Sequence, residues 1–427
     1  MFHGATYGAP HRDPTGSWGK SRRRRYSRGT RAVEAADRAE ALRPQLGSHH
    51  HWSGAGAAVG LTGGRVHLRS LTGFRFYAAM AVVLYHVALY FPGLGHTLDV
   101  FGYGFTGVSF FFILSGFVLS WSHTEGDRAG RFYWNRIARV WPLHALTTFL
   151  AVFVPPLAST TTIWPALPFV LTLTQSWLPG GGFVTAFNGV SWSLSCEAFF
   201  YLLFPLLIKG LRTWRRPEII AGTLFTAMVG IGIAVSVSLS GPVVGYLLGW
   251  LPLYRLGEFA LGICLALLIK RGWSPRFTLG QAVGLTGVLY AALLAASAIT
   301  SGGLGSVPVT YADLTMMPGF LAMIAAAATA DLNNKASSLS SNTIVRLGQW
   351  SFALYLVHEL VIRLVRPLVD GSPTGSVFMA AALVLTASVV LSGALHEFVE
   401  RPAERWLRAW GTTRRPSIGQ DHDPALR

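Results

Sequence analysis

Long apolar stretches alternate with short polar stretches from about residue 72 to about residue 398 of the chain. Each apolar stretch has roughly the 17 to 25 residues that an α-helix needs to cross the hydrocarbon core of a bilayer. A helix also satisfies its own backbone hydrogen bonds there. The pattern therefore predicts an all-α fold, a polytopic membrane helical bundle of about ten transmembrane helices. We expect these helices at residues 72–92, 105–122, 140–157, 190–208, 218–240, 246–270, 278–298, 312–331, 343–362 and 377–398.

The composition is typical of a membrane protein, and the sequence argues against several kinds of functional site. Of the 427 residues, 51% are hydrophobic and 13% are charged, whereas soluble domains carry about 25% charged residues. The two cysteines, Cys196 and Cys264, lie within apolar stretches, so we expect neither a disulfide framework nor a metal site. The sequence contains no P-loop, no HExxH motif and no GxSxG motif.

The distribution of basic residues predicts the direction of each span, because short basic loops stay in the cytoplasm. Residues 1–68 hold eleven Lys/Arg against four Asp/Glu, and we interpret them as a disordered basic cytoplasmic tail. The first span then runs outward and the later spans alternate, while residues 164–178 form a re-entrant or interfacial piece. Arg363 and Arg366 lie in the last outer loop and oppose the rule.

This organisation is that of a multi-pass protein of the plasma membrane with both termini in the cytoplasm. We expect the membrane domain at residues 69–406 and a cytoplasmic C-terminal tail at residues 407–427. The lipid bilayer is an expected partner. Nucleic acid is not, because no folded nucleic-acid-binding module accompanies the basic tail. The sequence makes no prediction of the oligomeric state.

The first expected span contains two ionisable residues, Arg75 and His86. Such a residue costs on the order of 3 kcal/mol to insert, so each requires a reason. Their separation of eleven residues places them on one face of a helix, about 16 Å apart along its axis. They are too far apart to touch but suit the two ends of one elongated substrate, such as acyl-CoA. Otherwise Arg75 is an interface arginine, and His86 is bonded to a neighbouring helix.

Three further charged residues support the hypothesis of an elongated substrate such as acyl-CoA. Arg136 and Arg139, in "NRIARVWPLH", are one helical turn apart and suit bidentate binding of phosphate, unless they are only cytoplasmic anchors. Glu197, in "SWSLSCEAFFYLLFP", has nearly the same expected depth as His86. A carboxylate beside an imidazole orients the ring and stabilises its protonated form. The alternative for Glu197 is a pair with an arginine elsewhere in the bundle.

The remaining ionisable residues in the spans have structural interpretations beside functional ones. Arg255 and Glu258 are three residues apart and predict an intrahelical ion pair, with a substrate contact as the second hypothesis. His358, near the outer end of its span, is either a contact for the acceptor substrate or an interface histidine. In "HEFVERP", which contains His396 and Glu400, a local salt bridge is expected.

Seven stretches occur in the order found in one known family, and together they cover about residues 68 to 406. The chain resembles the acyltransferase-3 family of membrane O-acyltransferases in "LRSLTGFRFYAAMAVVLYH", "GVSFFFILSGFVLS", "RFYWNRIARVWPLH", "SWSLSCEAFFYLLFP", "YRLGEFALG", "FALYLVH" and "HEFVERP". The family's Arg-x10-His motif falls on Arg75 and His86, its Arg-x-x-Arg motif on Arg136 and Arg139, and its glutamate on Glu197.

The resemblance implies an enzyme that moves an acyl group, commonly acetyl, from acyl-CoA to a hydroxyl of a sugar-containing acceptor, such as a macrolide or a surface glycan. In that hypothesis Arg75, Arg136 and Arg139 bind the coenzyme phosphates. His86 is the general base, supported by Glu197. Acyl-CoA is a donor substrate, and no permanently bound cofactor and no metal are expected.

Two other classes of function are compatible with the same charged residues. One is a proton-coupled secondary transporter or exporter, in which the buried groups relay protons. The other is a membrane scaffold whose charges only fix helix packing. An assay for transfer of label from acetyl-CoA to a hydroxyl separates all three hypotheses.

Overall fold

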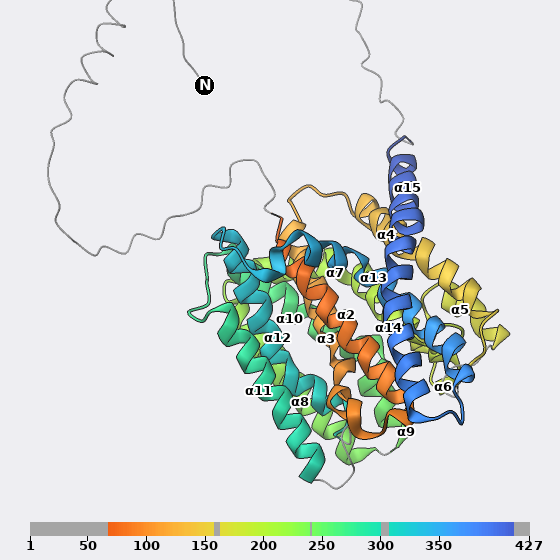
Figure 1. Ribbon diagram of the computed structural model, residues 1–427. Coiled ribbons are helices and arrows are strands. Elements are labelled where there is room, and N and C mark those ends of the chain that lie inside the picture. Colours follow the sequence, from red (N-terminus) through yellow and green to blue (C-terminus); the bar gives the residue numbers. More distant parts are fainter. Residues whose placement is uncertain (1–66, 158–162, 240, 300–306, 414–427) are drawn as a thin grey trace, which may run out of the picture. The chain divides into compact units, whose positions relative to one another are not determined.

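The computed structural model describes residues 67–157, 163–239, 241–299 and 307–413, and these contain helices but no β-strand (Figure 1). The predicted tail at residues 1–66 lies outside the described residues. The helices with more than ten residues are α2 (Arg69–Tyr90), α3 (Gly107–Ser122), α4 (Ala129–Ala151), α7 (Trp192–Thr213), α8 (Pro217–Ser238), α10 (Pro252–Lys270), α11 (Leu279–Ile299), α12 (Val309–Leu332), α13 (Asn342–Val365), α14 (Thr374–Leu395) and α15 (Arg401–Thr413).

The helices confirm the predicted polytopic bundle. Eight helical segments among the described residues are long and apolar enough to cross a membrane. Helices α4 and α13 also have the required length, with 23 and 24 residues, but each carries three charged side chains. With these two, the long helices correspond one for one to the ten predicted spans.

The start of α4 differs from the prediction. Helix α4 begins at Ala129 rather than near 140. Its first half contains Arg131, Arg136 and Arg139, which lower the hydropathy of a segment that is nevertheless helical. At the C-terminus, the helical chain continues to Thr413, so the boundary predicted at 406 falls within α15.

The piece at residues 164–178 does not cross the bundle. It consists of the short helices Trp164–Ala166, Leu167–Leu171 (α5) and Gln175–Trp177. Five residues of α-helix extend only about 7.5 Å. A short α-helical turn, Gly181–Val184 (α6), and a 3-10 turn at Gly189–Ser191 then lead into α7. The prediction of a re-entrant or interfacial piece is consistent with these lengths.

Glycines allow two pairs of helices to approach closely. A Cβ atom added at Gly348 of α13 would overlap the carbonyl oxygen of Thr72 in α2. Gly116 of α3 and Gly262 of α10 are restricted in the same way, because a Cβ on either would overlap the backbone of the other helix. These contacts hold α2 against α13 and α3 against α10, and so fix the helices that carry the ionisable residues.

Helices α2 and α13 run in the same direction (Figure 1). At their first turns Arg69 donates a 2.6 Å hydrogen bond to Asn342, and near their other ends His86 lies 3.1 Å from His358. The sequence predicts outward spans for both. Contacts between other helices also join ends that the sequence predicts on the same side of the membrane. For example, Lys270 at the end of α10 donates to Ser120 near the end of α3.

Arg363 and Arg366, which oppose the positive-inside rule, are bonded to helix ends. The guanidinium of Arg363 is buried and donates to the carbonyl oxygens of Ala151 (3.2 Å), Val154 (2.8 Å), Pro155 (2.6 Å) and Phe187 (2.6 Å). Arg366 donates to the carbonyl oxygen of Tyr90 at the end of α2. The last carbonyls of a helix lack intrahelical donors and carry partial negative charge, so an arginine stabilises them.

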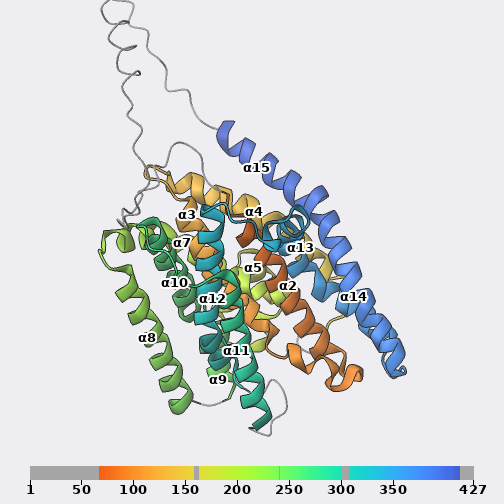
Figure 2. The same ribbon diagram turned by 60° about the vertical axis from the view of Figure 1, so that its left-hand side comes forward.

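Helices α14 and α15 form one long rod at the edge of the bundle (Figure 2). A π-helical turn, His396–Glu400, joins them. Arg401, directly after this turn, pairs with Glu397 at 3.1 Å, which confirms the local salt bridge expected for "HEFVERP". Within the turn, Nδ1 of His396 lies 3.1 Å from the carboxylate of Glu400. Helix α15 packs along the first half of α4, where the indole of Trp134 donates to the carbonyl oxygen of Leu407.

Candidate active site

A cavity of about 520 Å³ lies among α2, α3, α4, α7, α13 and the C-terminal helical rod. Arginines dominate its polar wall, and aromatic side chains form much of its apolar wall. The arginines are Arg75, Arg136, Arg139, Arg401 and Arg408, and the aromatic residues are Phe111, Phe112, Tyr201, Phe352 and Tyr355.

Two of the arginines face the cavity without a carboxylate partner. In the part of the chain that the structure describes, no ion pair is formed by Arg75 or Arg136. The Nε atom of Arg136 is buried and has no hydrogen-bond partner, while its guanidinium lies 5.8 Å from the ring of Phe132 and 5.9 Å from that of Tyr201. Unpaired guanidinium groups beside a cavity favour an anionic ligand, because such a ligand supplies the missing charge and acceptors.

The third predicted arginine has a different environment. Arg139 lies 3.3 Å from Glu404 and 3.8 Å from the buried carboxylate of Glu400. Glu404 also pairs with Arg408. Arg139 therefore holds the C-terminal rod against α4 as well as lining the cavity, and only part of its charge is available to a ligand.

The position of Glu197 corrects the expectation that it supports His86. Its carboxylate accepts a 2.8 Å hydrogen bond from Tyr201 and lines the arginine-rich cavity. The side-chain hydrogen bonds of His86 go instead to Val82 and His358. Two residues at the same depth in the membrane can lie on different sides of the helix bundle, so depth alone does not show that they are in contact. Glu197 lines the same cavity as Arg75 and Arg136 but forms no ion pair with an arginine among the described residues, so the alternative of such a pair stays a prediction.

His86 and His358 form a pair outside the lining of the cavity. Nδ1 of His86 lies 3.1 Å from Nε2 of His358. Neither histidine lines the cavity, but Tyr355 does, and its ring centroid is 6.0 Å from that of His358. The ring of His86 is also stacked on Tyr90, with centroids 6.0 Å apart. Tyr355 therefore lies next to both the cavity and the histidine pair.

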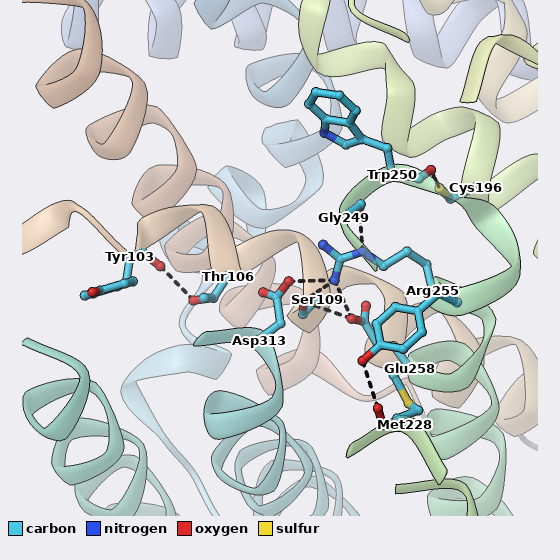
Figure 3. Close-up of polar contacts among 11 residues, drawn as sticks. Tyr103, Thr106, Ser109, Cys196, Met228, Gly249, Trp250, Arg255, Glu258 and Asp313 are labelled. Atoms are coloured by element: carbon cyan, nitrogen blue, oxygen red, sulfur yellow. Dashed lines mark hydrogen bonds and ion pairs between the residues drawn. The ribbon is translucent and has the colours of Figure 1, made fainter. Parts of the chain in front are cut away.

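Arg255 and Glu258 form the predicted ion pair, within a larger buried network (Figure 3). The Nη1 atom of Arg255 lies 2.6 Å from Glu258 and 2.6 Å from Asp313, and Nε donates to the carbonyl oxygen of Gly249. Ser109 donates to Glu258 at 3.2 Å. These side chains are at most 3% exposed and do not line the large cavity. A substrate contact by Arg255 or Glu258 stays a prediction.

A second cavity of about 300 Å³ is also basic, but Arg212 pairs with Glu125 there, and its other two cations, Lys270 and Arg271, contact backbone groups. Lys270 donates to the carbonyl oxygens of Ser120 and His123, and Arg271 donates to those of Arg212 and Arg215. Burial lowers the pKa of His123, which follows α3. These groups cap the ends of α3 and α7, which explains their charge without a ligand.

Several residues of the large cavity were not predicted. Tyr201 and Tyr355 line it beside Glu197, and the hydroxyl of Tyr355 contacts Ser193 at 2.9 Å. Arg401 and Arg408 come from the C-terminal rod. The motif "HEFVERP" contains Arg401, but the sequence predicts only a local salt bridge there. Arg401 lies on the cavity wall because α15 packs against α4, and the sequence does not predict this packing.

The fold and the cavity define a polytopic membrane protein with an arginine-lined chamber inside its helix bundle. The family model described as "Acyltransferase domain", that of the acyltransferase-3 family, matches residues 68–396. The chain belongs to this family.

Three relatives illustrate the similarity. The chain is 36% identical to acyltransferase MdmB of Streptomyces mycarofaciens over 388 residues, which cover 84% of this chain and 96% of the relative. It is 30% identical to nodulation protein 10 of Rhizobium leguminosarum bv. viciae over 39% of this chain and 50% of the relative. It is 27% identical to O-acetyltransferase OatA of Staphylococcus aureus over 40% and 29%, respectively. No solved structure matches the chain.

Proposed function

We propose that this protein transfers an acyl group, commonly acetyl, from acyl-CoA to a hydroxyl of a sugar-containing acceptor such as a macrolide or a surface glycan. Membership of the acyltransferase-3 family supports the reaction class. The observation that carries the choice of donor is the pair Arg75 and Arg136, which face one cavity without a carboxylate partner among the described residues. The phosphates of the coenzyme supply the charges that these guanidinium groups lack.

The donor lies along α2 in this proposal. Its phosphates contact Arg75 and Arg136, with Arg139 at the edge of the same site. Arg75 and His86 are separated by about 16 Å along the helix. The extended arm of the coenzyme covers this distance past the cavity residues Phe111 and Tyr355 to reach His86. The thioester then lies beside His86. The arginines of the cavity lie toward the cytoplasm in this proposal, and acyl-CoA enters from that side.

The chemistry requires one base and one leaving group. His86 takes the proton of the acceptor hydroxyl while the oxygen attacks the thioester carbonyl. The new C–O bond forms, the C–S bond breaks, and the coenzyme leaves as a thiolate. The proton held by His86 then passes to that thiolate, so the base returns to its neutral state. Glu197 and Tyr201 lie near the phosphate end and contribute to donor binding rather than to proton transfer.

Purified protein in lipid nanodiscs tests the proposal. Radiolabelled acetyl-CoA is supplied with a panel of macrolides and glycans, and both free thiol and labelled ester are measured. We expect equal amounts of thiol and ester with at least one acceptor, and loss of both in His86→Ala at unchanged thermal stability. Substantial transfer by His86→Ala would remove His86 as the base. Substrate flux across vesicles without thiol release would favour a transporter.

A further inference from the structure

The hydrogen bonds around His86 and His358 allow only one arrangement of the two ring hydrogens in the neutral pair. Nδ1 of His86 lies 3.0 Å from the carbonyl oxygen of Val82, and Nδ1 of His358 lies 3.1 Å from that of Leu354. A carbonyl oxygen only accepts hydrogen bonds, so each Nδ1 atom must carry the hydrogen. Each neutral ring has one such hydrogen. Both Nε2 atoms therefore have a free lone pair.

The 3.1 Å contact between the rings then has a defined direction. Nδ1 of His86 is the donor, shared between Val82 and His358, and Nε2 of His358 is the acceptor. The opposite direction would place a hydrogen on Nε2 of His358 and leave its Nδ1 lone pair against the carbonyl oxygen of Leu354. It would also set the lone pair of His86 Nδ1 against the carbonyl oxygen of Val82. Both contacts would be repulsive.

We propose that His358 is a positioning residue for His86, which accepts the Nδ1 hydrogen and so leaves Nε2 of His86 as the basic atom. This inference rests on the proposed acyl transfer with His86 as base. In many enzymes a carboxylate fixes the tautomer of a catalytic histidine. Here the backbone carbonyl of Val82 and a second imidazole perform that task.

The arrangement also suits the protonated state of His86. When Nε2 takes the acceptor proton, the ring keeps its Nδ1 hydrogen and the same two acceptors, so no hydrogen bond must be broken or re-formed. The bond from a charged donor is stronger than that from a neutral one. Nε2 of His358 accepts this bond, while its own Nδ1 hydrogen remains on Leu354. The proton therefore stays on Nε2 of His86, from which it returns to the leaving thiolate.

The place of His358 agrees with this role. Its side chain is fully buried, and it does not line the cavity. It lies on α13, which the contact of Gly348 with Thr72 holds against α2. A rigid pair of parallel helices thus sets the distance between the two rings. A fully buried His358 that accepts from His86 has no free nitrogen for an acceptor substrate.

Nitrogen NMR of the full-length protein in lipid bilayers, labelled with ¹⁵N-histidine, tests the tautomers without any substrate. The signals of the two rings are assigned by difference, with His86→Gln and His358→Gln. We expect a hydrogen on Nδ1 and a bare Nε2 in both rings of the neutral protein. A hydrogen on Nε2 of His358 would reverse the direction of the bond and overturn the proposal, whether or not the protein proves to be an acyltransferase.

Kinetics with matched variants test the consequence. His358→Phe retains the ring volume but removes the acceptor, and we expect kcat to fall by about 100-fold or more, since a correctly placed base contributes about 10² to 10⁴. The KM for acyl-CoA should not change. His358→Gln places an amide oxygen near the former Nε2 and should recover much of kcat. Equal losses of kcat in both variants, or a loss that appears only in KM, would assign His358 to packing or substrate binding instead.

Discussion

Arg75 of α2 and Arg136 of α4 face the same cavity, and neither forms an ion pair with any described residue. Sixty residues of chain separate them. Each lies within the helical bundle, where an unpaired charge is costly. A protein that keeps two such groups beside one cavity gains from a ligand that neutralises both.

Replacing either arginine tests that idea. We expect Arg75→Ala and Arg136→Ala each to raise the KM for acyl-CoA by about 10- to 100-fold, because a hydrogen bond to a charged group contributes about 1.5 to 3 kcal/mol. The kcat at saturating donor should fall much less. Isothermal titration with a non-reactive coenzyme analogue measures the same change as affinity. Arg131→Ala is the matched control, since this exposed arginine belongs to α4 but does not line the cavity. Unchanged affinity in both variants would reassign the pair to anchoring.

Removing Arg255 should destabilise the bundle. Arg255→Met leaves the carboxylates of Glu258 and Asp313 buried together without their cation. Breaking a buried pair in this way costs about 3 to 5 kcal/mol, so we expect a clear fall in the thermal melting temperature in nanodiscs. Adding Glu258→Gln and Asp313→Asn to the same chain should restore part of the stability. A variant that melts normally but loses acceptor binding would instead support the predicted substrate contact.

Arg363 should matter for stability far more than its neighbour Arg366. Arg363→Leu leaves four carbonyl oxygens without their donor, and one buried unsatisfied group alone costs about 1 to 3 kcal/mol. We expect a large fall in melting temperature, only partly prevented in Arg363→Lys, because an ammonium lacks the planar fork of arginine. Arg366→Ala is the control, since its side chain is about one-third exposed and donates to one carbonyl. Similar losses at both positions would argue against this explanation.

The close contact of α13 with α2 predicts a difference between two glycines. Gly348→Ala places a methyl group against the carbonyl oxygen of Thr72, and overpacking of this kind costs about 1 to 3 kcal/mol. It should also displace His358 from His86 and lower kcat. Gly284→Ala on α11 adds its methyl group in open space and should be neutral or slightly stabilising. Melting curves and initial rates of both variants distinguish steric clash from a general effect of glycine replacement.

The fold was predictable from the sequence because apolar length determines which segments cross a bilayer. Helix α4 shows where this fails, since the arginines of its first half lower the hydropathy of residues that are helical. The positive-inside rule likewise counts Arg363 as an exception, although its guanidinium donates to carbonyl oxygens at and just after the end of α4 and to that of Phe187. Hydropathy and loop charge describe a segment alone. They carry no information about which helix covers it.

The candidate site was predictable where residues share a helix and less so where they do not. Arg136 and Arg139 are one turn apart, and the structure places both on one cavity with Arg75. Depth alone predicts that Glu197 supports His86, but its carboxylate is bonded to Tyr201 instead. The partner found for His86 is His358, on a helix 272 residues away in sequence. Only the packing of α2 against α13 reveals this pair.

The C-terminal helical rod has a practical consequence for protein engineering. Arg401 and Arg408 form part of the cavity wall, and Glu400 and Glu404 balance the charge of Arg139. A truncation chosen from hydropathy, with a stop codon after residue 398, would leave every predicted span intact. It would nevertheless open one side of the cavity, because Arg401 and Arg408 would be lost. Purification tags fused to the end of the chain are therefore best separated from α15 by a long linker.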